Sequence, residues 1–331
     1  MKHSNISIFI PHIGCPHRCS FCDQRTISGA ENIPHGDDVR EICEKALAEV
    51  KSPENTEIAF FGGSFTAIPR AYMIELLEAA YSFVGEGKFK GIRLSTRPDC
   101  IDREVLTILK KYGVTSIELG AQSMSNKVLE ANQRGHSADD VEKAAKLIRE
   151  FGFELGLQMM VGLYNSTAKR ELYTMDEIIK IRPDTVRIYP VVVLKGTRLA
   201  ELYESGEYAM MFFEKIIQLC STMLREFSDN GIEVIKCGLH ASEFVERDML
   251  GGFYHPAFRE LCESNIYRRK MEELIAYETK SGLDFVFAVN STCISKAMGH
   301  KKSNVEYFKN QGINIKIIGD ENIPKYQVEL R

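Results

Sequence analysis

Three of the nine cysteines stand close together near the start of the chain, in the segment GCPHRCSFCDQR. They are Cys15, Cys19 and Cys22, so their spacing is C-x3-C-x2-C. Thiols can be oxidised to a disulfide, and thiolates can bind zinc or the iron of an iron–sulfur cluster. This segment could therefore form a disulfide, a closed zinc site, or a cluster with one iron left open.

The fourth ligand separates the two kinds of metal site. A structural zinc site takes four ligands, and His12 and His17 are close enough in sequence to supply one. An iron–sulfur cluster of the ferredoxin type takes four thiolates, but the next cysteine, Cys43, lies in the middle of a predicted helix. Three thiolates and one open iron fit the segment better, and zinc is the alternative.

The composition is that of a soluble globular protein. The 331 residues are 44% hydrophobic and 27% charged, with no tryptophan and a formal net charge of -4. The N-terminal segment MKHSNISIFIPHIG is too short for a signal-peptide core or a membrane span. We therefore expect a cytoplasmic protein without a membrane partner. Because the cytoplasm is reducing, an odd number of cysteines indicates thiols and metal ligands, which excludes the disulfide.

The net charge gives no general reason to expect a nucleic-acid partner. Two local basic clusters, Arg268-Arg269-Lys270 and His300-Lys301-Lys302, are candidate footprints for one. The alternative for such clusters is a solvated helix face, which is the commoner meaning of a charge run.

The elements that must position these residues follow one pattern from Ile6 onward: short apolar runs rich in β-branched residues alternate with segments of helical periodicity. The expected strands are SIFIP, EIAFF, GIRLS, SIELG, ELGLQMM and TVRIYPV. The expected helices are 37–52, 69–85, 102–113, 139–151, 167–182 and 197–204, followed by a long helix that ends near residue 230. Six β-α units in a row predict an α/β fold with a parallel sheet, either a full or partial barrel or an open doubly wound sheet.

The pattern loosens after residue 230. IEVIKCGLH is a plausible seventh strand, and Gly251-Gly252 and Tyr254-His255-Pro256 indicate loops. A helix over 257–279 and two strands, LDFVFAV and INIKII, around a lysine-rich helix complete the chain. We expect the chain to divide into a barrel over 1–235 and an α+β extension over 236–331.

Ligands of parallel α/β folds gather at the carboxyl ends of the strands, so the residues at those ends indicate the site. Successive strands end at the cysteine segment, FFGGSF, LSTRPD, ELGAQS, LQMMVG and RIYPVV. Glycine and polar residues therefore collect on one rim of the sheet. No nucleophile and base pair stands out there, which counts against hydrolysis.

Three polar side chains within the strands are expected to point into the site. Glu118 lies between Ile117 and Leu119, so alternation turns it to the opposite face from them, which in a barrel is the inside. The same reasoning applies to Gln158 and Arg187, although a satisfied buried hydrogen-bond pair is an equally good explanation of each.

Two further polar groups adjoin the rim. Arg97 with Asp99, and Arg134-Gly135-His136, could form structural ion pairs or touch a ligand. Met159-Met160 is more readily explained as core filling.

The segment C-x3-C-x2-C, with Phe21 just before its last cysteine, resembles the signature of radical S-adenosylmethionine enzymes. The resemblance implies that Cys15, Cys19 and Cys22 hold a 4Fe-4S cluster whose fourth iron binds S-adenosylmethionine. It implies that an electron, supplied by a ferredoxin or flavodoxin type of reductant protein, cleaves this cofactor to a 5′-deoxyadenosyl radical. The cofactor carries that chemistry, and the protein binds and orients it.

The resemblance also assigns residues to cofactor binding. Gly62-Gly63-Ser64 is similar to the glycine-rich segment of the family, where the backbone approaches the methionine amino group. Glu118 is then a candidate contact for the ribose or methionine, and Gln122-Ser123 are expected to line the pocket. Gln158 and Arg187 complete the predicted cofactor site.

Within this superfamily, several segments together resemble the subgroup of the Elongator catalytic subunit and the oxygen-independent coproporphyrinogen oxidases, and are closer to the former. They are CPHRCSFC, FFGGSFTAIP, LSTRPD, SIELGAQS, LQMMVGL, TVRIYPVVVLKGT and HPAFRELCES. The fold that this implies is a partial (β/α)6 TIM-like barrel. The chain ends at Arg331 without the acetyltransferase domain of the Elongator subunit, so carboxymethyl transfer to a wobble uridine is not carried over from the resemblance, whereas the cluster and S-adenosylmethionine are.

The function expected from these residues is hydrogen abstraction from an RNA base, such as a tRNA base, or from a small metabolite. A porphyrin precursor is the main alternative with the same chemistry. A zinc-stabilised RNA-binding module without catalysis is the alternative from another class, and metal analysis would separate the two.

The remaining cysteines and histidines could suggest a second metal. They are Cys237, His240, Cys262, Cys293 and His300. Their spacing contains no C-x2-C pair, and buried cysteines commonly behave as small hydrophobic residues. We therefore expect no second metal, and Cys237 with His240 is the strongest pair for one.

Overall fold

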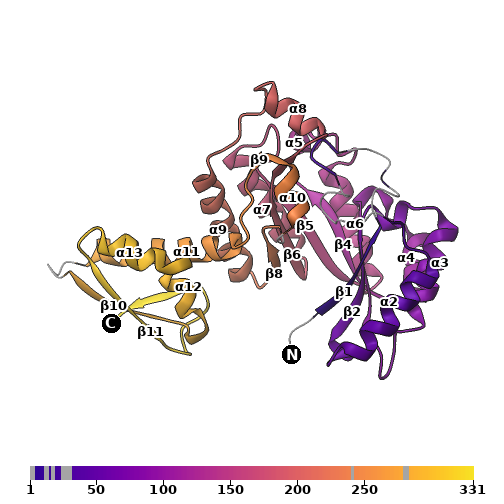
Figure 1. Ribbon diagram of the computed structural model, residues 1–331, viewed down its shortest axis with the longest axis horizontal. Helices are drawn as coiled ribbons and strands as arrows, with labels where there is room; N and C mark the ends of the chain where they lie inside the picture. The colour runs from indigo at the N-terminus through magenta and orange to yellow at the C-terminus, as the bar shows by residue number, and fades with distance from the viewer. Residues whose placement is uncertain (1–3, 11–14, 16–18, 24–31, 240–241, 279–282) are drawn as a thin grey trace.

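The computed structural model of the chain describes residues 4–10, 15, 19–23, 32–239, 242–278 and 283–331. A large parallel sheet with helices around it forms most of the molecule, and a smaller part with its own sheet lies at the end of a long helix (Figure 1). The first strand lies at one edge of the large sheet, and the C-terminus lies in the smaller part.

The large sheet has seven described strands, and each neighbouring pair is parallel. Their bounds are β1 Ser4–Ile10, β2 Thr56–Gly62, β3 Gly91–Thr96, β4 Val114–Gln122, β5 Glu154–Val161, β6 Thr185–Pro190 and β8 Glu233–Cys237. Their order in the sheet is their order along the chain. A doubly wound sheet would reverse its strand order at a switch point, whereas this order is that of a curled partial barrel. The predicted α/β class and partial barrel are confirmed.

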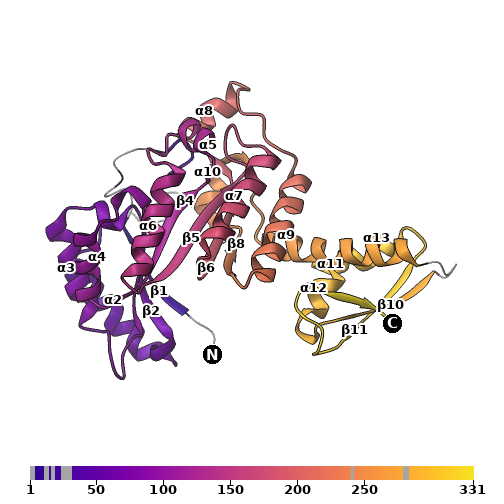
Figure 2. The same ribbon diagram turned by 180° about the vertical axis from the view of Figure 1, so that it is seen from behind.

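Six long helices connect these strands. They are α2 Gly36–Glu49, α3 Arg70–Tyr81, α4 Arg103–Lys111, α6 Ala138–Glu150, α7 Ala168–Ile181 and α9 Phe213–Asp229. Figure 2 shows α6 and α7 in front of β4 and β5, which are seen from their other side in Figure 1. Asp102 and Ser137 cap α4 and α6 by accepting hydrogen bonds from backbone N–H groups, which defines where these helices begin. Two short helices, α5 Asn126–Ala131 and α8 Arg198–Glu204, follow the ends of β4 and β7.

The two faces of the large sheet differ in character because side chains alternate along a strand. On β4, Ile117 and Leu119 are fully buried on the face that the helices cover, whereas Glu118 between them lines a cavity on the inner face. On β1, Ile8 is buried while Ser7 and Phe9 line the same cavity. The apolar half of each strand therefore forms the core, and the other half forms the inner wall of the barrel.

A second pair of strands lies beside the carboxyl ends of β5 and β6, where the sequence predicted a loop. β7 (Val192–Leu194) pairs antiparallel with β9 (Met249–Gly252), which follows the short helix α10 (Glu243–Asp248). Gly252 has a φ of +116°, and a Cβ there would lie 2.6 Å from the carbonyl oxygen of Val191. The prediction of a loop at Gly251-Gly252 was wrong, because these glycines let two strands approach closely instead of turning the chain.

The C-terminal module, defined here as residues 283–331, packs on α11 (Phe258–Tyr277). Its strands are β10 Asp284–Val289, β11 Asn314–Gly319 and β12 Val328–Leu330. β10 lies in the middle, parallel to β11 and antiparallel to β12. The expected lysine-rich helix is two helices, α12 (Ile294–Met298) and α13 (Ser303–Lys309), because the backbone leaves the helical region at Lys301 and Lys302.

The predicted division of the chain at residue 235 stays a prediction, and β8, the last strand of the large sheet, spans that position. In the part of the chain that the structure describes, no helix is both long and apolar enough to cross a membrane.

Candidate functional site

A cavity of about 380 Å³ lies on the inner face of the large sheet and reaches the carboxyl ends of its strands. Its walls run from Ser7 on β1 to Lys236 on β8. Seven residues that the sequence assigned to cofactor binding line it: Gly62, Gly63, Ser64, Glu118, Gln122, Gln158 and Arg187. Cys15 and Cys22 line it too. The cavity is therefore the place where the predicted site is assembled, although the roles of its residues stay predictions.

The three cysteines of the first segment lie close enough to influence one another. Burial, and after it the charges of Cys19 and Cys15, raise the pKa of the Cys22 thiol to about 12. Burial also raises the pKa of Cys15, while a backbone hydrogen bond at Ser64 lowers it. Three thiolates packed this closely repel one another, so they need positive charge beside them.

Two arginines supply that positive charge. Arg134 Nη1 donates a hydrogen bond to Cys19 Sγ at 2.9 Å, and Nη2 donates to the carbonyl oxygen of Gly120 at 2.7 Å. Arg97 donates two hydrogen bonds of 2.9 Å to the carboxylate of Asp99. Both guanidinium groups lower the pKa of Cys15 by their charge. Of the two sequence alternatives for Arg97, the structure shows the ion pair, and it also places Arg97 in the cavity wall.

The donor set fits an iron–sulfur cluster. Thiolates are the ligands of such clusters, and buried N–H groups near the sulfurs adjust their properties. The buried Nε of Arg134 and Nη1 of Arg97 have no hydrogen-bond partner among the described residues. Among those residues no three Cys, His, Asp or Glu side chains come together as ligands of a single metal ion. His12 and His17, the candidates for a zinc ligand, lie outside the described residues.

Gly62 and Gly63 bring bare backbone to the cavity wall. Gly62 has a φ of +112°, and a Cβ there would lie 2.7 Å from the carbonyl oxygen of Ile10. The N–H of Gly63 donates to the same oxygen at 2.8 Å, which ties the end of β2 to the end of β1. Ser64 then shares a hydrogen bond of 2.9 Å with the hydroxyl of Thr96. The backbone turn after β2 therefore requires glycine and is held in place from two neighbouring strands.

Glu118 and Arg187 form an ion pair across the inner face of the sheet. Arg187 Nε donates to Glu118 Oε2 at 2.6 Å, and the two side chains are 15% and 3% exposed. The guanidinium carbon of Arg187 also lies 5.2 Å from the ring centre of Phe61. Burial is the largest single influence on the pKa of Arg187 and lowers it, but the charges of Glu118 and Tyr189 and the hydrogen bonds to them together raise that pKa. Both explanations of Arg187 hold, since it is a satisfied partner that also lines the cavity.

Gln122 and Gln158 form a second pair on the same wall. Gln158 Nε2 donates to Gln122 Oε1 at 3.2 Å. Gln122 has a φ of +64°, and the pairing of β4 with β5 shifts register between Gly120 and Gln122. Such a bulge with a strained residue often re-aims a side chain at a functional site. Ser123, which was expected beside Gln122 in the pocket, instead contacts Thr174 at 3.1 Å behind the wall.

Lys236 and Tyr189 also line the cavity, and the sequence reasoning missed both. Lys236 pairs in register with Arg187 on the neighbouring strand. Burial, followed by the charges of Arg187 and Arg259, lowers the pKa of Lys236. Lys236 is a polar residue within an apolar strand, which is the signal that identified Arg187, so the sequence could have indicated it.

The remaining cysteines and histidines, for which no second metal was expected, do not come together in one group among the described residues. Cys237 lies with Cys220 and Cys262, and their thiols form hydrogen bonds to one another. Cys293 interacts instead with Tyr267, and His240 lies outside the described residues.

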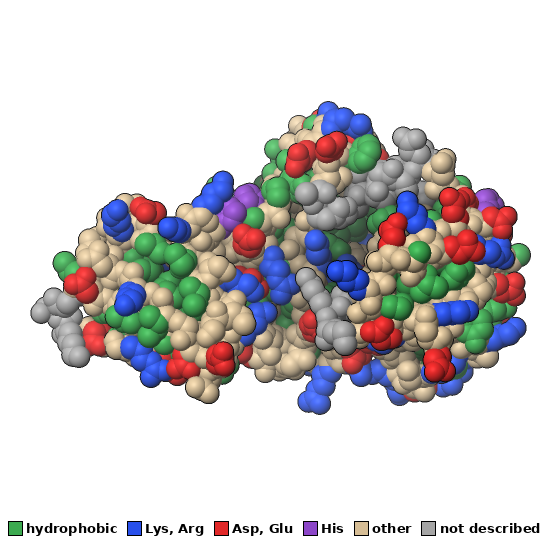
Figure 3. All heavy atoms as spheres, turned by 60° about the horizontal axis from the view of Figure 1, so that its bottom comes forward, with side chains coloured by type: hydrophobic (Ala, Val, Ile, Leu, Met, Phe, Trp, Pro, Cys, Tyr) green, Lys and Arg blue, Asp and Glu red, His purple; other side chains and the backbone are tan. Residues whose placement is uncertain are grey.

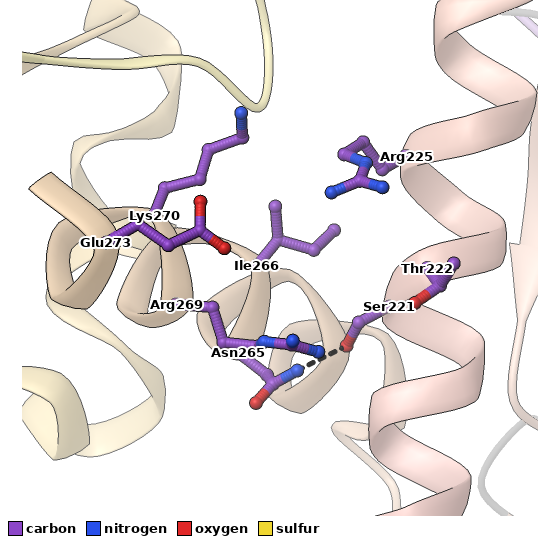
Figure 4. A pocket seen from close by; sticks show the side chains of 8 residues that line it. All are labelled: Ser221, Thr222, Arg225, Asn265, Ile266, Arg269, Lys270 and Glu273. Carbon is purple, nitrogen blue, oxygen red and sulfur yellow. Dashed lines mark hydrogen bonds between the residues drawn. The ribbon is translucent and has the colours of Figure 1, made fainter.

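A second cavity, of about 100 Å³, lies between α9 and α11 (Figure 4). It carries Arg225, Lys270 and Glu273, and Asn265 donates to Ser221 Oγ at 3.0 Å in its floor. It contains none of the residues of the predicted site.

Comparison with known proteins finds two family models and several relatives that match the chain. The Radical SAM superfamily model matches residues 9–178, and the model of the Radical_SAM C-terminal domain matches residues 183–268. The chain is 31% identical to an uncharacterized protein of Methanocaldococcus jannaschii, over 65% of this chain and 70% of that protein. It is 27% identical to the tRNA uridine(34) acetyltransferase of Methanocaldococcus infernus, over 62% of this chain. The chain covers 46% of that enzyme, so it spans less than half of its length.

Solved structures agree with the fold. The archaeal Elp3 of Methanocaldococcus infernus, with an N-terminal deletion, superposes with a TM-score of 0.57 at 21% identity, over 74% of this chain and 61% of that chain. SuiB of Streptococcus suis superposes with a TM-score of 0.51 at 15% identity, over 72% of this chain and 50% of that chain. The motif-based resemblance to this superfamily, and to its Elongator side, is thereby confirmed.

Proposed function

This chain belongs to the radical SAM superfamily, and from its site we propose that it cleaves S-adenosylmethionine reductively and abstracts a hydrogen atom from a base of an RNA, most simply a tRNA. The observation that carries this proposal is the gathering of three thiols, two arginines and the predicted cofactor-binding residues around one cavity. The reaction would make the protein an oxidoreductase or a transferase.

Cys15, Cys19 and Cys22 would hold the 4Fe-4S cluster, and the cluster with S-adenosylmethionine supplies a 5′-deoxyadenosyl radical. Arg134 donates to Cys19 and Arg97 lies near Cys15, so their charges stabilise the thiolates. The buried N–H groups of these arginines that lack partners among the described residues would supply donors to cluster sulfur.

The remaining wall residues would bind S-adenosylmethionine. Gly62 and Gly63 bring the chain backbone to the cavity wall without side-chain obstruction. Glu118 presents an acceptor for ribose hydroxyl or amino groups, and the hydrogen bond from Arg187 holds that carboxylate in place. Gln122 and Gln158 offer amide donors and acceptors on the same wall. Their positions fix the orientation of the cofactor, which decides the atom that a radical can reach.

An RNA base as substrate is supported by the names of the relatives. The matched archaeal enzyme is a tRNA uridine(34) acetyltransferase, and the chain is 31% identical to human Elongator complex protein 3 over 52% of this chain and 35% of that protein. Acetyl transfer itself is not proposed for this chain, since the match covers less than half of either protein. We propose a ferredoxin or flavodoxin type of reductant and work in the cytoplasm, where thiolates stay reduced.

The test is anaerobic. The protein is reconstituted with iron and sulfide, reduced with dithionite and given S-adenosylmethionine, and 5′-deoxyadenosine is measured by mass spectrometry. One arm adds bulk tRNA and another adds a tRNA-free metabolite extract. We expect 5′-deoxyadenosine that tRNA stimulates. Stimulation by the metabolite arm alone would favour the small-molecule substrate, and zinc in place of iron would favour the non-catalytic module.

A Cys43→Ala variant serves as the matched control, because Cys43 is fully buried in α2 away from the cavity. It should keep the cluster and the 5′-deoxyadenosine, whereas Cys19→Ala should lose both. Equal product from the two variants would contradict the proposal.

A further inference from the structure

The four-residue segment Gly299–Lys302, Gly-His-Lys-Lys, forms a tight loop between α12 and α13 in the C-terminal module. Gly299, Lys301 and Lys302 have φ values of +87°, +52° and +64°. Lysine rarely takes this left-handed conformation, and two in succession are costly to hold. Strained backbone of this kind persists only where the surroundings impose it, and it is concentrated at functional sites.

The surroundings do impose this conformation. The N–H of His300 donates to Ser264 Oγ at 3.0 Å, and His300 Nδ1 lies 2.9 Å from Glu260 Oε2. Asn304, just after the loop, donates to the carbonyl oxygen of Ser264 at 2.9 Å. A Cβ on Gly299 would lie 2.7 Å from the backbone nitrogen of Asn304. The loop is therefore fastened to α11 on one side and to α13 on the other before any ligand arrives.

The fastened loop presents two positive charges to solvent. Lys301 and Lys302 are exposed, and neither takes part in an ion pair among the described residues. Lys296, one helix earlier, differs because its Nζ lies 2.9 Å from the buried carboxylate of Glu263. The loop lysines thus keep their charge available for a partner outside the module.

The loop lies on the side of the module that adjoins the barrel. The ring of His300 packs edge-on against His255, with 5.7 Å between ring centres. α11 begins nearby at Phe258, which packs so closely on Gly238 that a Cβ there would lie 2.8 Å from Phe258 Cβ. Leu239, the next residue, lines the large cavity. Only the beginning of α11 therefore lies between the loop and the cavity wall.

Cations continue from the cavity toward the module. The charge of Arg187 in the cavity wall lowers the pKa of Lys236, and the charge of Arg259 does the same. The charges of Arg259 and Lys296 likewise lower the pKa of Lys325 in the C-terminal module. Figure 3 shows Lys and Arg side chains gathered where the module meets the barrel. Most of these cations are paired within the protein, Arg187 with Glu118 and Arg259, Lys296 and Lys325 with Glu263. The loop lysines, which take part in no ion pair among the described residues, are therefore the charges that a polyanion at this junction would meet.

We propose that the Gly299–Lys302 loop is a binding site for the phosphate backbone of single-stranded RNA, and that it holds the strand whose base enters the large cavity. Lys301 and Lys302 each contact a phosphate, and the fastened loop holds the two charges next to each other. KH modules clamp a short stretch of RNA backbone with a four-residue loop that contains glycine. The likeness is one of loop type and not of sequence. The inference takes from the proposed function only that the substrate is an RNA base.

The test measures RNA binding separately from chemistry. The full-length holoprotein, reconstituted anaerobically, is titrated into a labelled single-stranded RNA of about 12 nucleotides while salt is varied. The test variant is Lys301→Asn with Lys302→Asn, since asparagine tolerates positive φ and carries no charge. The control variant is Lys309→Asn with Lys316→Asn, which removes two exposed lysines elsewhere in the module. Circular dichroism checks that both variants fold.

Two lost phosphate contacts should lower the slope of log affinity against log salt by about 1.4, since each contact on a single strand contributes about 0.7. The same slope corresponds to an affinity loss of roughly 25-fold at about 0.1 M salt. The control variant should bind like the wild type. Equal loss in the two variants, or an unchanged slope in the loop variant, would overturn the proposal. Displacement of the RNA by polyglutamate at equal charge concentration would overturn it too, since it would indicate an acidic protein partner.

Cleavage of S-adenosylmethionine separates this proposal from the proposed function. If RNA binds through the loop but never stimulates 5′-deoxyadenosine, the loop assignment stands and the proposed substrate fails. If tRNA stimulates the reaction equally in wild type and loop variant, the proposed function stands and the loop assignment fails.

Discussion

Cys15, Cys19 and Cys22 lie around an open cavity beside two arginines, whereas Cys220, Cys237 and Cys262 face one another in the core between α9, β8 and α11. The first three are partly exposed and the second three are buried. The two groups contain the same three side chains, yet only the first has both access to a ligand and a guanidinium donor on its sulfur.

The difference shows that charge and access, more than the number of thiols, decide what a group of cysteines does. Burial raises the pKa of Cys220 and Cys262, whereas hydrogen bonds with these two thiols lower the pKa of Cys237, so the core group is satisfied within itself. Burial also raises the pKa of Cys15 and Cys22 at the rim, but there the charge of Arg134 acts against the rise. A thiolate is the metal ligand, so the rim group is the one prepared for a metal centre.

The largest expected effect comes from removing the rim group, which is Cys15, Cys19 and Cys22. The triple variant Cys15→Ala, Cys19→Ala, Cys22→Ala should lose its iron and sulfide down to the background level, because no thiolate ligand would remain in the segment. Colorimetric iron and sulfide assays after anaerobic reconstitution measure this. Full retention of both iron and sulfide would show that the rim group is not the metal site and does not differ from the core group in metal binding.

The ion pair on the inner wall should matter for stability as well as for cofactor binding. Arg187→Met would leave the buried Glu118 carboxylate without its partner, which costs about 3–5 kcal/mol of unfolding free energy. Arg187→Met with Glu118→Leu removes both charges and should cost less than the single change. Urea unfolding of the two single variants and the double variant measures the coupling. Additive losses would mean that the pair does not act as a unit.

Glu171, a buried residue of α7, should influence the free energy of unfolding and not the iron content. Burial raises its pKa from 4.5 to about 7, so the unfolded chain releases the proton at lower pH than the folded one. Stability should therefore fall as pH rises from about 4.5 to about 7, by about 3 kcal/mol. Glu171→Gln should remove this fall, so the variant gains stability above pH 7 and equals the wild type near pH 4.5. The measurement is the free energy of unfolding of the variant and the wild type across this pH range. A gain in stability that is equal at every pH would contradict the raised pKa of Glu171.

The smallest effect is expected from a substitution in the core group, which is Cys220, Cys237 and Cys262. Cys262→Ala removes a fully buried thiol and its contacts with Cys220 and Cys237, which should lower the unfolding free energy by about 1–2 kcal/mol. Its iron and sulfide content should match the wild type. Loss of iron from this variant would mean that the core group also serves a metal, contrary to the contrast drawn above.

Most of the barrel could be predicted because its signals are local. Strand and helix periods, and the restriction of polar residues to strand ends, placed six β-α units and the rim with only shifts of boundary; the helix expected over 69–85, for example, ends at Tyr81. The C-terminal module was harder. Its lysine-rich segment has helical composition, but Gly299 and the contacts of His300 with α11 break it into two helices.

The sequence by itself determined the kinds of group in the site and the face on which they stand. The C-x3-C-x2-C spacing indicated a metal centre, and a period of two along the strands directed Glu118 inward. These are properties of neighbouring residues, so they can be read without knowing the fold.

Only the tertiary structure decided which of these groups meet. Arg187 reaches Glu118 from 69 residues away, and Arg134 reaches Cys19 from 115 residues away. The partners are set by sheet register and by the chain path over the rim, and a bulge at Gly120–Gln122 adjusts them further. Because a contact between distant residues depends on the packing of everything between them, no local pattern encodes it.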